Sequence, residues 1–166
     1  MAEKTKKLAL TAVLTAAALI VFIIEAQIPA PVPIPGIKLG LANIIVLTAM
    51  LLLGRKTAGV VQLLRIIMGA VFVGPATLLY SAAGGLLAYG VMCALVGVIP
   101  EKRLWVLSAL AAVAHNAGQL AACVLVVKTP GVFAYLPVLA VSGIITGIFT
   151  GFAAMYLVRA LRKMNV

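Results

Sequence analysis

Long apolar runs, interrupted only by short segments rich in proline, glycine and basic residues, fill most of this chain. Residues 66–100, 104–127 and 129–158 contain no aspartate, glutamate, lysine or arginine. Each run is longer than the ~20 residues with which a helix crosses the hydrocarbon core of a bilayer. The pattern therefore predicts an all-α, polytopic membrane protein.

The interruptions divide the chain into six predicted membrane-spanning helices, which would form a single integral membrane domain over residues 1–166. They are expected at residues 8–27, 39–53, 57–72, 76–98, 104–127 and 132–158. The second helix is short, so either the preceding loop contributes to the span or the bilayer is locally thin. No soluble domain or internal repeat is visible in the sequence.

Composition and charge agree with this class of protein. Hydrophobic residues make up 65% of the chain and charged residues 10%, whereas soluble domains contain roughly 45–50% apolar residues. In a soluble protein, the net charge of +10 would suggest nucleic-acid binding. Here the basic residues stand in short clusters between apolar segments, so we expect no nucleic-acid partner.

The positions of lysine and arginine predict the orientation, because basic loops stay on the cytoplasmic side of a membrane. With the N-terminus inside, the cytoplasmic basic residues are Lys4, Lys6, Lys7, Arg55, Lys56, Lys102, Arg103, Arg159, Arg162 and Lys163. Only Lys38 and Lys128 fall on the outer side. We therefore expect a multi-pass protein of the cell membrane with both termini in the cytoplasm.

The predicted first external loop is unusually rich in proline. Residues 28–38 read IPAPVPIPGIK, with Pro29, Pro31, Pro33 and Pro35 followed by Gly36. Proline fixes φ and removes a backbone donor, so this segment should be extended and stiff. It is either a linker that turns the chain or a lid over an outward-facing cavity.

Ionisable and amide side chains are scarce within the predicted spans, where they are costly and usually face the protein interior. The candidate ligand-binding residues are Glu25, Asn43, Arg65, His115, Asn116 and Gln119. They suggest a polar pocket that opens outward, in which Arg65 would favour an anionic or strongly polar ligand. In the alternative interpretation these groups satisfy one another, with Arg65 paired to Glu25 or held by carbonyl groups as a structural clasp.

Rows of small residues mark where helices approach closely in lipid. Gly143, Gly147 and Gly151 form a GxxxGxxxG row, and Ala12 and Ala16 have an AxxxA spacing. Such rows serve either packing within the bundle or docking of another membrane subunit.

The chain lacks the residues of a self-sufficient enzyme. It has no aspartate, no GxxxxGK[ST] phosphate loop and a single histidine. Magnesium-diphosphate chemistry requires clustered carboxylates, and ATP hydrolysis of the phosphate-loop type requires that loop. We therefore expect no catalytic residue, no metal and no cofactor, and any uphill transport would depend on a partner or an ion gradient.

The segment EAQIPAPVPIPGIKLGLANIIVLTAMLLLG, residues 25–54, resembles the signature of the heptaprenyl diphosphate synthase component I family, also called the Gx transporter family. The layout of six short-looped helices is also similar to the S components of energy-coupling factor transporters. This resemblance implies that the chain captures a small molecule from outside and that the first external loop closes over it. It also implies that Ala12 and Ala16 contact a transmembrane coupling subunit, and that ATPases on separate chains drive release.

Two functions follow as hypotheses. The leading one is a substrate-capture subunit of a multi-subunit importer for a small vitamin-like or isoprenoid-related molecule. The alternative is a non-catalytic, lipid-embedded subunit of a prenyl diphosphate synthase, or of a quinone- or flavin-linked electron-transfer system.

Overall fold

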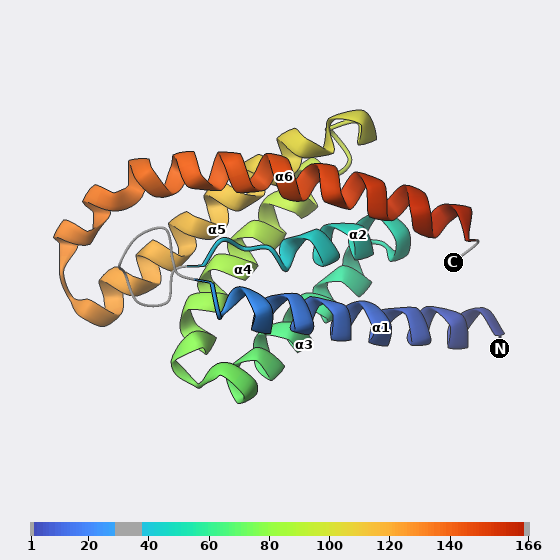
Figure 1. Cartoon of the computed structure of the whole chain (residues 1–166), viewed down its shortest axis with the longest axis horizontal. Coiled ribbons are helices and arrows are strands. Elements are labelled where there is room, and N and C mark those ends of the chain that lie inside the picture. Colours follow the sequence, from blue (N-terminus) through green and yellow to red (C-terminus); the bar gives the residue numbers. More distant parts are fainter. Residues whose placement is uncertain (1, 29–37, 165–166) are drawn as a thin grey trace.

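A computed structural model of the chain describes residues 2–28 and 38–164, and within these ranges it contains six α-helices and no strand (Figure 1). The helices are α1 (Ala2–Glu25), α2 (Asn43–Leu53), α3 (Arg55–Val73), α4 (Ala76–Leu95), α5 (Leu104–Val127) and α6 (Leu136–Lys163). Two short 3-10 helices, η1 (Glu101–Arg103) and η2 (Pro130–Tyr135), precede α5 and α6. The predicted all-α class is confirmed.

Several helices begin or end at other residues than the sequence suggested. The bounds of α5 are those expected, whereas α1 and α6 extend further toward the chain ends. Helix α2 begins only at Asn43, because Gly40 adopts a left-handed φ of 79° and a turn follows it. Helix α4 stops at Leu95, and η2 delays the start of α6 to Leu136.

Five of the described helices are long and apolar enough to cross a membrane: α1, α3, α4, α5 together with η1, and α6 together with η2. Helix α2 is equally apolar but has only 11 residues. At about 1.5 Å per residue it would cover roughly half of a ~30 Å hydrocarbon core. These lengths support a membrane protein, while the count of six crossings and the orientation of the termini stay predictions.

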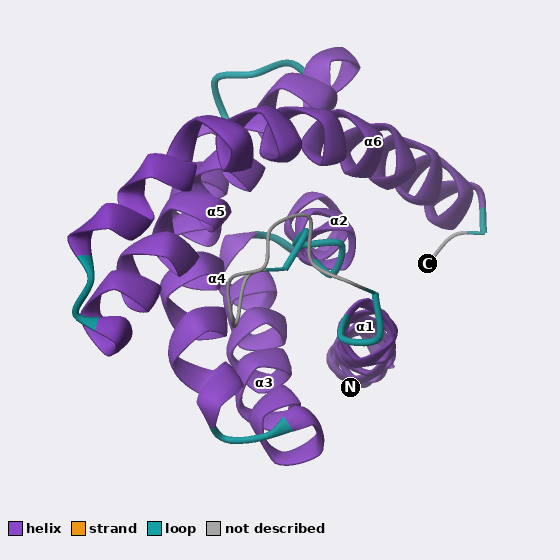
Figure 2. Ribbon diagram, turned by 60° about the vertical axis from the view of Figure 1, so that its left-hand side comes forward, coloured by secondary structure: helices purple, strands orange, loops and turns teal. Residues whose placement is uncertain are grey.

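The short helix α2 lies in the middle of the bundle. It contacts α1, α3, α4 and α6, and the view along α1 places it among the longer helices (Figure 2). The most extensive contacts join α5 to α6 and α4 to α5. Helix α1 begins and α6 ends at the same end of the bundle (Figure 1).

After its exposed first turn, helix α3 has its polar side chains inside and most of its apolar side chains outside, the reverse of a helix in a soluble protein. Its buried residues recur at helical spacing and are Ala58, Val61, Gln62, Arg65, Ile66 and Gly69. The opposite face exposes Val60, Leu63, Leu64, Ile67, Met68 and Val71. This distribution suits a hydrocarbon environment, and it turns Arg65 toward the bundle interior.

The glycine row of α6 packs against α5. A methyl group on Gly147 would lie 2.8 Å from the Ser108 carbonyl oxygen, and one on Gly151 would lie 3.0 Å from the Trp105 nitrogen. Beside this seam, the hydroxyls of Ser108 and Thr150 share a buried hydrogen bond of 2.8 Å. The row therefore serves packing within the bundle, one of the two uses that the sequence left open.

Candidate functional site

All six candidate ligand-binding residues are buried, each with at most 6% of its surface exposed. They come from α1, α2, α3 and α5, and all of them except Asn116 gather with two further polar residues. We call this cluster the polar core, and its members are Glu25, Lys38, Asn43, Gln62, Arg65, His115 and Gln119. Asn116 contacts α6 instead. Glu25 ends α1 and Asn43 begins α2, so the cluster lies away from the end of the bundle where α1 begins.

The turn before α2 ties three of these side chains together. The Glu25 carboxylate accepts a hydrogen bond from the backbone N–H of Gly40. A methyl group on Gly40 would lie 3.2 Å from Asn43 Nδ2 and 3.2 Å from His115 Cδ2. Glycine is therefore required here twice, for its left-handed φ and for this close approach.

Arg65 is buried with no carboxylate of the described residues within 4 Å, and Glu25 attracts it from a longer distance. Its Nη2 donates to the Gln62 side-chain oxygen at 3.0 Å, and its guanidinium carbon lies 5.4 Å from the centroid of the Phe22 ring. Among the described residues the one salt bridge is elsewhere, between Arg162 and Glu101. The expected alternative of an Arg65 ion pair with Glu25 is therefore not realised within 4 Å.

Lys38 joins the polar core from the loop before α2. Its backbone N–H donates to the Gln119 side-chain oxygen at 3.0 Å, and its Nζ lies 3.8 Å above the centroid of the Phe22 ring. Burial lowers the pKa of the Lys38 ammonium, the Glu25 carboxylate opposes this shift, and the Arg65 charge adds to it. Both cations therefore lie beside the same Phe22 ring.

Helix α5 contributes two members of the polar core, His115 and Gln119, and directs Asn116 toward α6. Asn116 Nδ2 donates to the Leu139 carbonyl oxygen of α6 at 2.8 Å. A methyl group on Gly84 of α4 would lie 3.1 Å from His115 Cε1 and 2.7 Å from Gln119 Cγ. The missing side chain of Gly84 therefore makes room for the polar face of α5.

The polar core is incompletely satisfied. Across the part of the chain that the structure describes, all but one of the buried side-chain nitrogens and oxygens without a hydrogen-bond partner belong to this cluster. The atoms in the cluster are Lys38 Nζ, Asn43 Nδ2 and Oδ1, Gln62 Nε2, Arg65 Nε and His115 Nδ1, and the exception is Asn116 Oδ1. Buried polar groups in native proteins are nearly always paired with protein, water or ligand, so this concentration of unpaired atoms is unusual.

Some neighbours of the candidate site were not among the predicted site residues. Gln62 and Phe22 each lie three residues before a predicted site residue and so share its helix face, a signal that could have identified them. The burial of Lys38 and the close approach of Gly40 and Gly84 follow from the folded arrangement and had no such signal.

The two other predicted features are the lid and the docking surface. The proposed lid residues, Pro29, Pro31, Pro33, Pro35 and Gly36, lie outside the described residues. Ala12 and Ala16 are exposed on α1 and line a groove between α1 and α3.

Within residues 2–28 and 38–164, no three histidine, cysteine, aspartate or glutamate side chains gather as a metal site would require.

Comparison with known proteins gives one result. A protein-family model described as heptaprenyl diphosphate synthase component I matches residues 14–157. Neither a curated protein nor a solved structure matches the chain.

Proposed function

We propose that this chain, which belongs to the heptaprenyl diphosphate synthase component I family, is the substrate-capture subunit of a multi-subunit importer. Its ligand would be a small anionic or strongly polar molecule of the vitamin-like or isoprenoid-related kind, held in the polar core. Both termini would lie in the cytoplasm, so that the polar core is reached from the outer side.

The observation that carries this proposal is the buried Arg65, which has no described carboxylate within 4 Å. Its side chain is 2% exposed, its Nε has no partner, and its described hydrogen bond goes to a neutral amide. Burying an unpaired charge costs several kcal/mol (about 3–5 when a buried pair is broken). A ligand anion between Arg65 and Lys38 would remove that cost.

The remaining polar atoms define what else the ligand would carry. Asn43 offers both a donor and an acceptor, and Gln62 Nε2 and His115 Nδ1 are also without partners. A molecule with an anionic group at one end and a hydroxyl, amide or ring nitrogen at the other would pair with the cations and with these neutral groups. This combination favours a small polar metabolite over a plain hydrocarbon as the ligand.

Energy for uphill transport would come from other chains. Ala12 and Ala16 present an exposed small-residue surface on α1, and we assign this surface to a transmembrane coupling subunit that connects to ATPases. Co-expression with candidate coupling and ATPase subunits tests this. The Ala12→Leu/Ala16→Leu variant should no longer co-purify with these subunits, whereas the matched Ala82→Leu/Ala121→Leu variant on α4 and α5 should still do so.

The ligand itself is tested by mass spectrometry of small molecules retained after gentle purification. Wild-type protein should release a compound that is absent from an Arg65→Met preparation. The control is Arg162→Met, which removes an exposed arginine of the Glu101 pair and should leave the compound in place. The same compounds in all three preparations would remove Arg65 from any ligand site.

The family description favours a second function, a non-catalytic membrane subunit of a prenyl diphosphate synthase. A subunit of a quinone- or flavin-linked electron-transfer system is the other form of this alternative. The absence of aspartate from the chain argues against catalysis by this subunit. This function predicts a polyprenyl compound and a synthase or redox partner in the purified complex, and no coupling or ATPase subunit.

A further inference from the structure

A groove between α1 and α3 changes character along its length. One stretch is lined by Lys4 and Lys7 of α1 and Lys56 of α3, and the next stretch is lined by alanine, leucine and methionine side chains. The two stretches share Leu8, Thr11 and Val60. They therefore form one continuous groove with a basic end and an apolar body.

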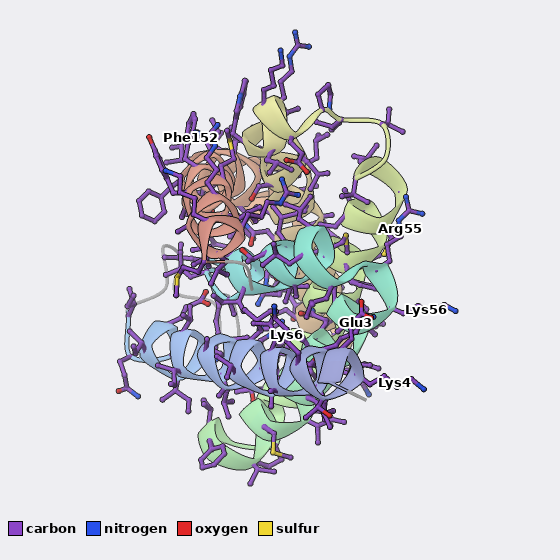
Figure 3. All side chains as sticks on the ribbon, turned by 90° about the vertical axis from the view of Figure 1, so that its right-hand side faces the viewer. Glu3, Lys4, Lys6, Arg55, Lys56 and Phe152 are labelled. Carbon is purple, nitrogen blue, oxygen red and sulfur yellow. The ribbon has the colours of Figure 1, made fainter. Side chains whose placement is uncertain are left out.

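Residues 2–28 and 38–164 place no carboxylate in a salt bridge with the basic end. Lys4, Lys7 and Lys56 are exposed, and the described chain provides no carboxylate within salt-bridge distance of them. No acidic side chain lines this stretch. The side chains of Lys4 and Lys56 extend from the same end of the molecule, whereas Glu3 and Lys6 lie between α1 and α2 (Figure 3).

The apolar body has the length of one lipid chain in one leaflet. From Leu8 to Leu19, both of which line it, the helix rises about 16 Å, while half of a ~30 Å hydrocarbon core is about 15 Å. Ala12 and Ala16 face this stretch from α1, and Leu64 and Met68 face it from α3. The two alanines give the groove its depth, because larger side chains there would fill it.

We propose that this groove binds one anionic phospholipid of the cytoplasmic leaflet. Its phosphate lies among Lys4, Lys7 and Lys56, and one acyl chain follows α1 past Ala12 and Ala16. Basic sites between helices on the cytoplasmic side suit anionic headgroups, with roughly 1 kcal/mol for each lysine near the membrane surface. The apolar body selects a lipid over free phosphate.

This site rests on the proposed orientation and not on ligand capture in the polar core. It overlaps the surface that we assign to a coupling subunit. Docking of that subunit on Ala12 and Ala16 would displace the acyl chain, so the two occupants exclude each other.

Native mass spectrometry of delipidated protein in detergent tests the proposal. Phosphatidylglycerol and phosphatidylcholine with identical acyl chains are added separately, and the concentration that gives half-occupancy of one bound lipid is measured. Wild-type protein should bind phosphatidylglycerol at least about tenfold more tightly than phosphatidylcholine. This follows because each lysine contributes about fivefold, on the basis of roughly 1 kcal/mol apiece.

Two triple variants separate this site from general charge. Lys4→Gln/Lys7→Gln/Lys56→Gln should abolish the preference for phosphatidylglycerol. The matched variant removes the same charge elsewhere, at the exposed Lys102, Arg103 and Lys163, and should keep the preference. The proposal would be overturned if both variants lost the preference for phosphatidylglycerol to the same extent, or if wild-type protein bound the two lipids with equal affinity.

A second pair of variants tests the path of the acyl chain. Ala12→Leu/Ala16→Leu should weaken phosphatidylglycerol binding severalfold, whereas Ala82→Leu/Ala121→Leu in the groove between α4 and α5 should not. Unchanged binding in the first variant would refute a chain in this groove. Competition by glycerol phosphate, which has no acyl chain, or tighter binding of farnesyl diphosphate would refute a bilayer phospholipid as the occupant.

Discussion

Replacing Arg65 by methionine distinguishes a ligand-binding arginine from a structural clasp. Methionine is unbranched, favours helix and fills irregular space, so the substitution removes mainly the charge and the hydrogen bonds. If Arg65 is a structural clasp, its replacement should lower the unfolding free energy by about 3–5 kcal/mol, as the loss of one partner of a buried pair does. If Arg65 serves a ligand, its replacement should lower the unfolding free energy of the ligand-free protein far less.

The contacts of Arg65 allow the magnitude to be worked out. The hydrogen bond to Gln62 contributes about 1.5–3 kcal/mol, and the Phe22 ring at 5.4 Å contributes about 0.5–2 kcal/mol. Attraction to Glu25 beyond 4 Å adds less than about 4 kcal/mol, and repulsion from Lys38 reduces it. Against these gains stands a desolvation penalty of several kcal/mol for the buried ion.

The favourable contacts and the desolvation penalty nearly cancel, so we expect Arg65→Met to change the unfolding free energy of the ligand-free protein by no more than about 2 kcal/mol. At about 2–4 °C per kcal/mol for a chain of this size, Tm should move by less than about 8 °C. Thermal unfolding in detergent measures this, with Arg162→Met as a control that should cost about 0–1 kcal/mol, as exposed pairs do. A fall in Tm of more than about 10 °C for Arg65→Met would refute the reasoning and favour the clasp.

Three further predictions concern stability. Gly147→Ala should lower the unfolding free energy by about 1–3 kcal/mol because its methyl group meets the α5 backbone. The control is Gly90→Ala, whose methyl group meets nothing within 4 Å and which should be neutral or stabilise by up to about 1 kcal/mol. Thermal unfolding compares the two variants. Thr150→Val, which removes the hydrogen bond to Ser108, should cost about 0.6 kcal/mol and less than about 1.7 in the same assay. Because the folded-state pKa of Lys38 lies below 10.5, its charged form opposes folding, so the unfolding free energy should rise as pH increases through that pKa. Lys38→Met should flatten this rise in unfolding curves recorded at increasing alkaline pH, and an unchanged slope would contradict the assignment.

The positions of most helices could be read from the sequence because uncharged runs of this length have few alternatives. The interior position of Arg65 was also predictable, since an ionised side chain that faced hydrocarbon would be too costly. The start of α2 was misjudged because Gly40 takes a left-handed φ, and an apolar run does not reveal which of its glycines does so.

The glycine row of α6 illustrates a question that sequence spacing leaves open. A GxxxGxxxG pattern permits close approach by any helix, whether from the same chain or from another. The structure assigns this approach to α5, where the backbone around Ser108 occupies the space next to Gly147. The AxxxA spacing of Ala12 and Ala16 looks equivalent in sequence, yet these two residues remain exposed.

By itself the sequence determined that the chain is helical and apolar enough for a membrane, because hydropathy and the scarcity of charge are local properties. It also named six polar residues that lipid would not accept. Only the tertiary structure decided that Arg65 is buried beyond 4 Å from any described carboxylate, and that Lys38 and Gln62 join the same cluster. Distances between side chains on different helices depend on how those helices pack, and no periodicity within a single helix encodes them.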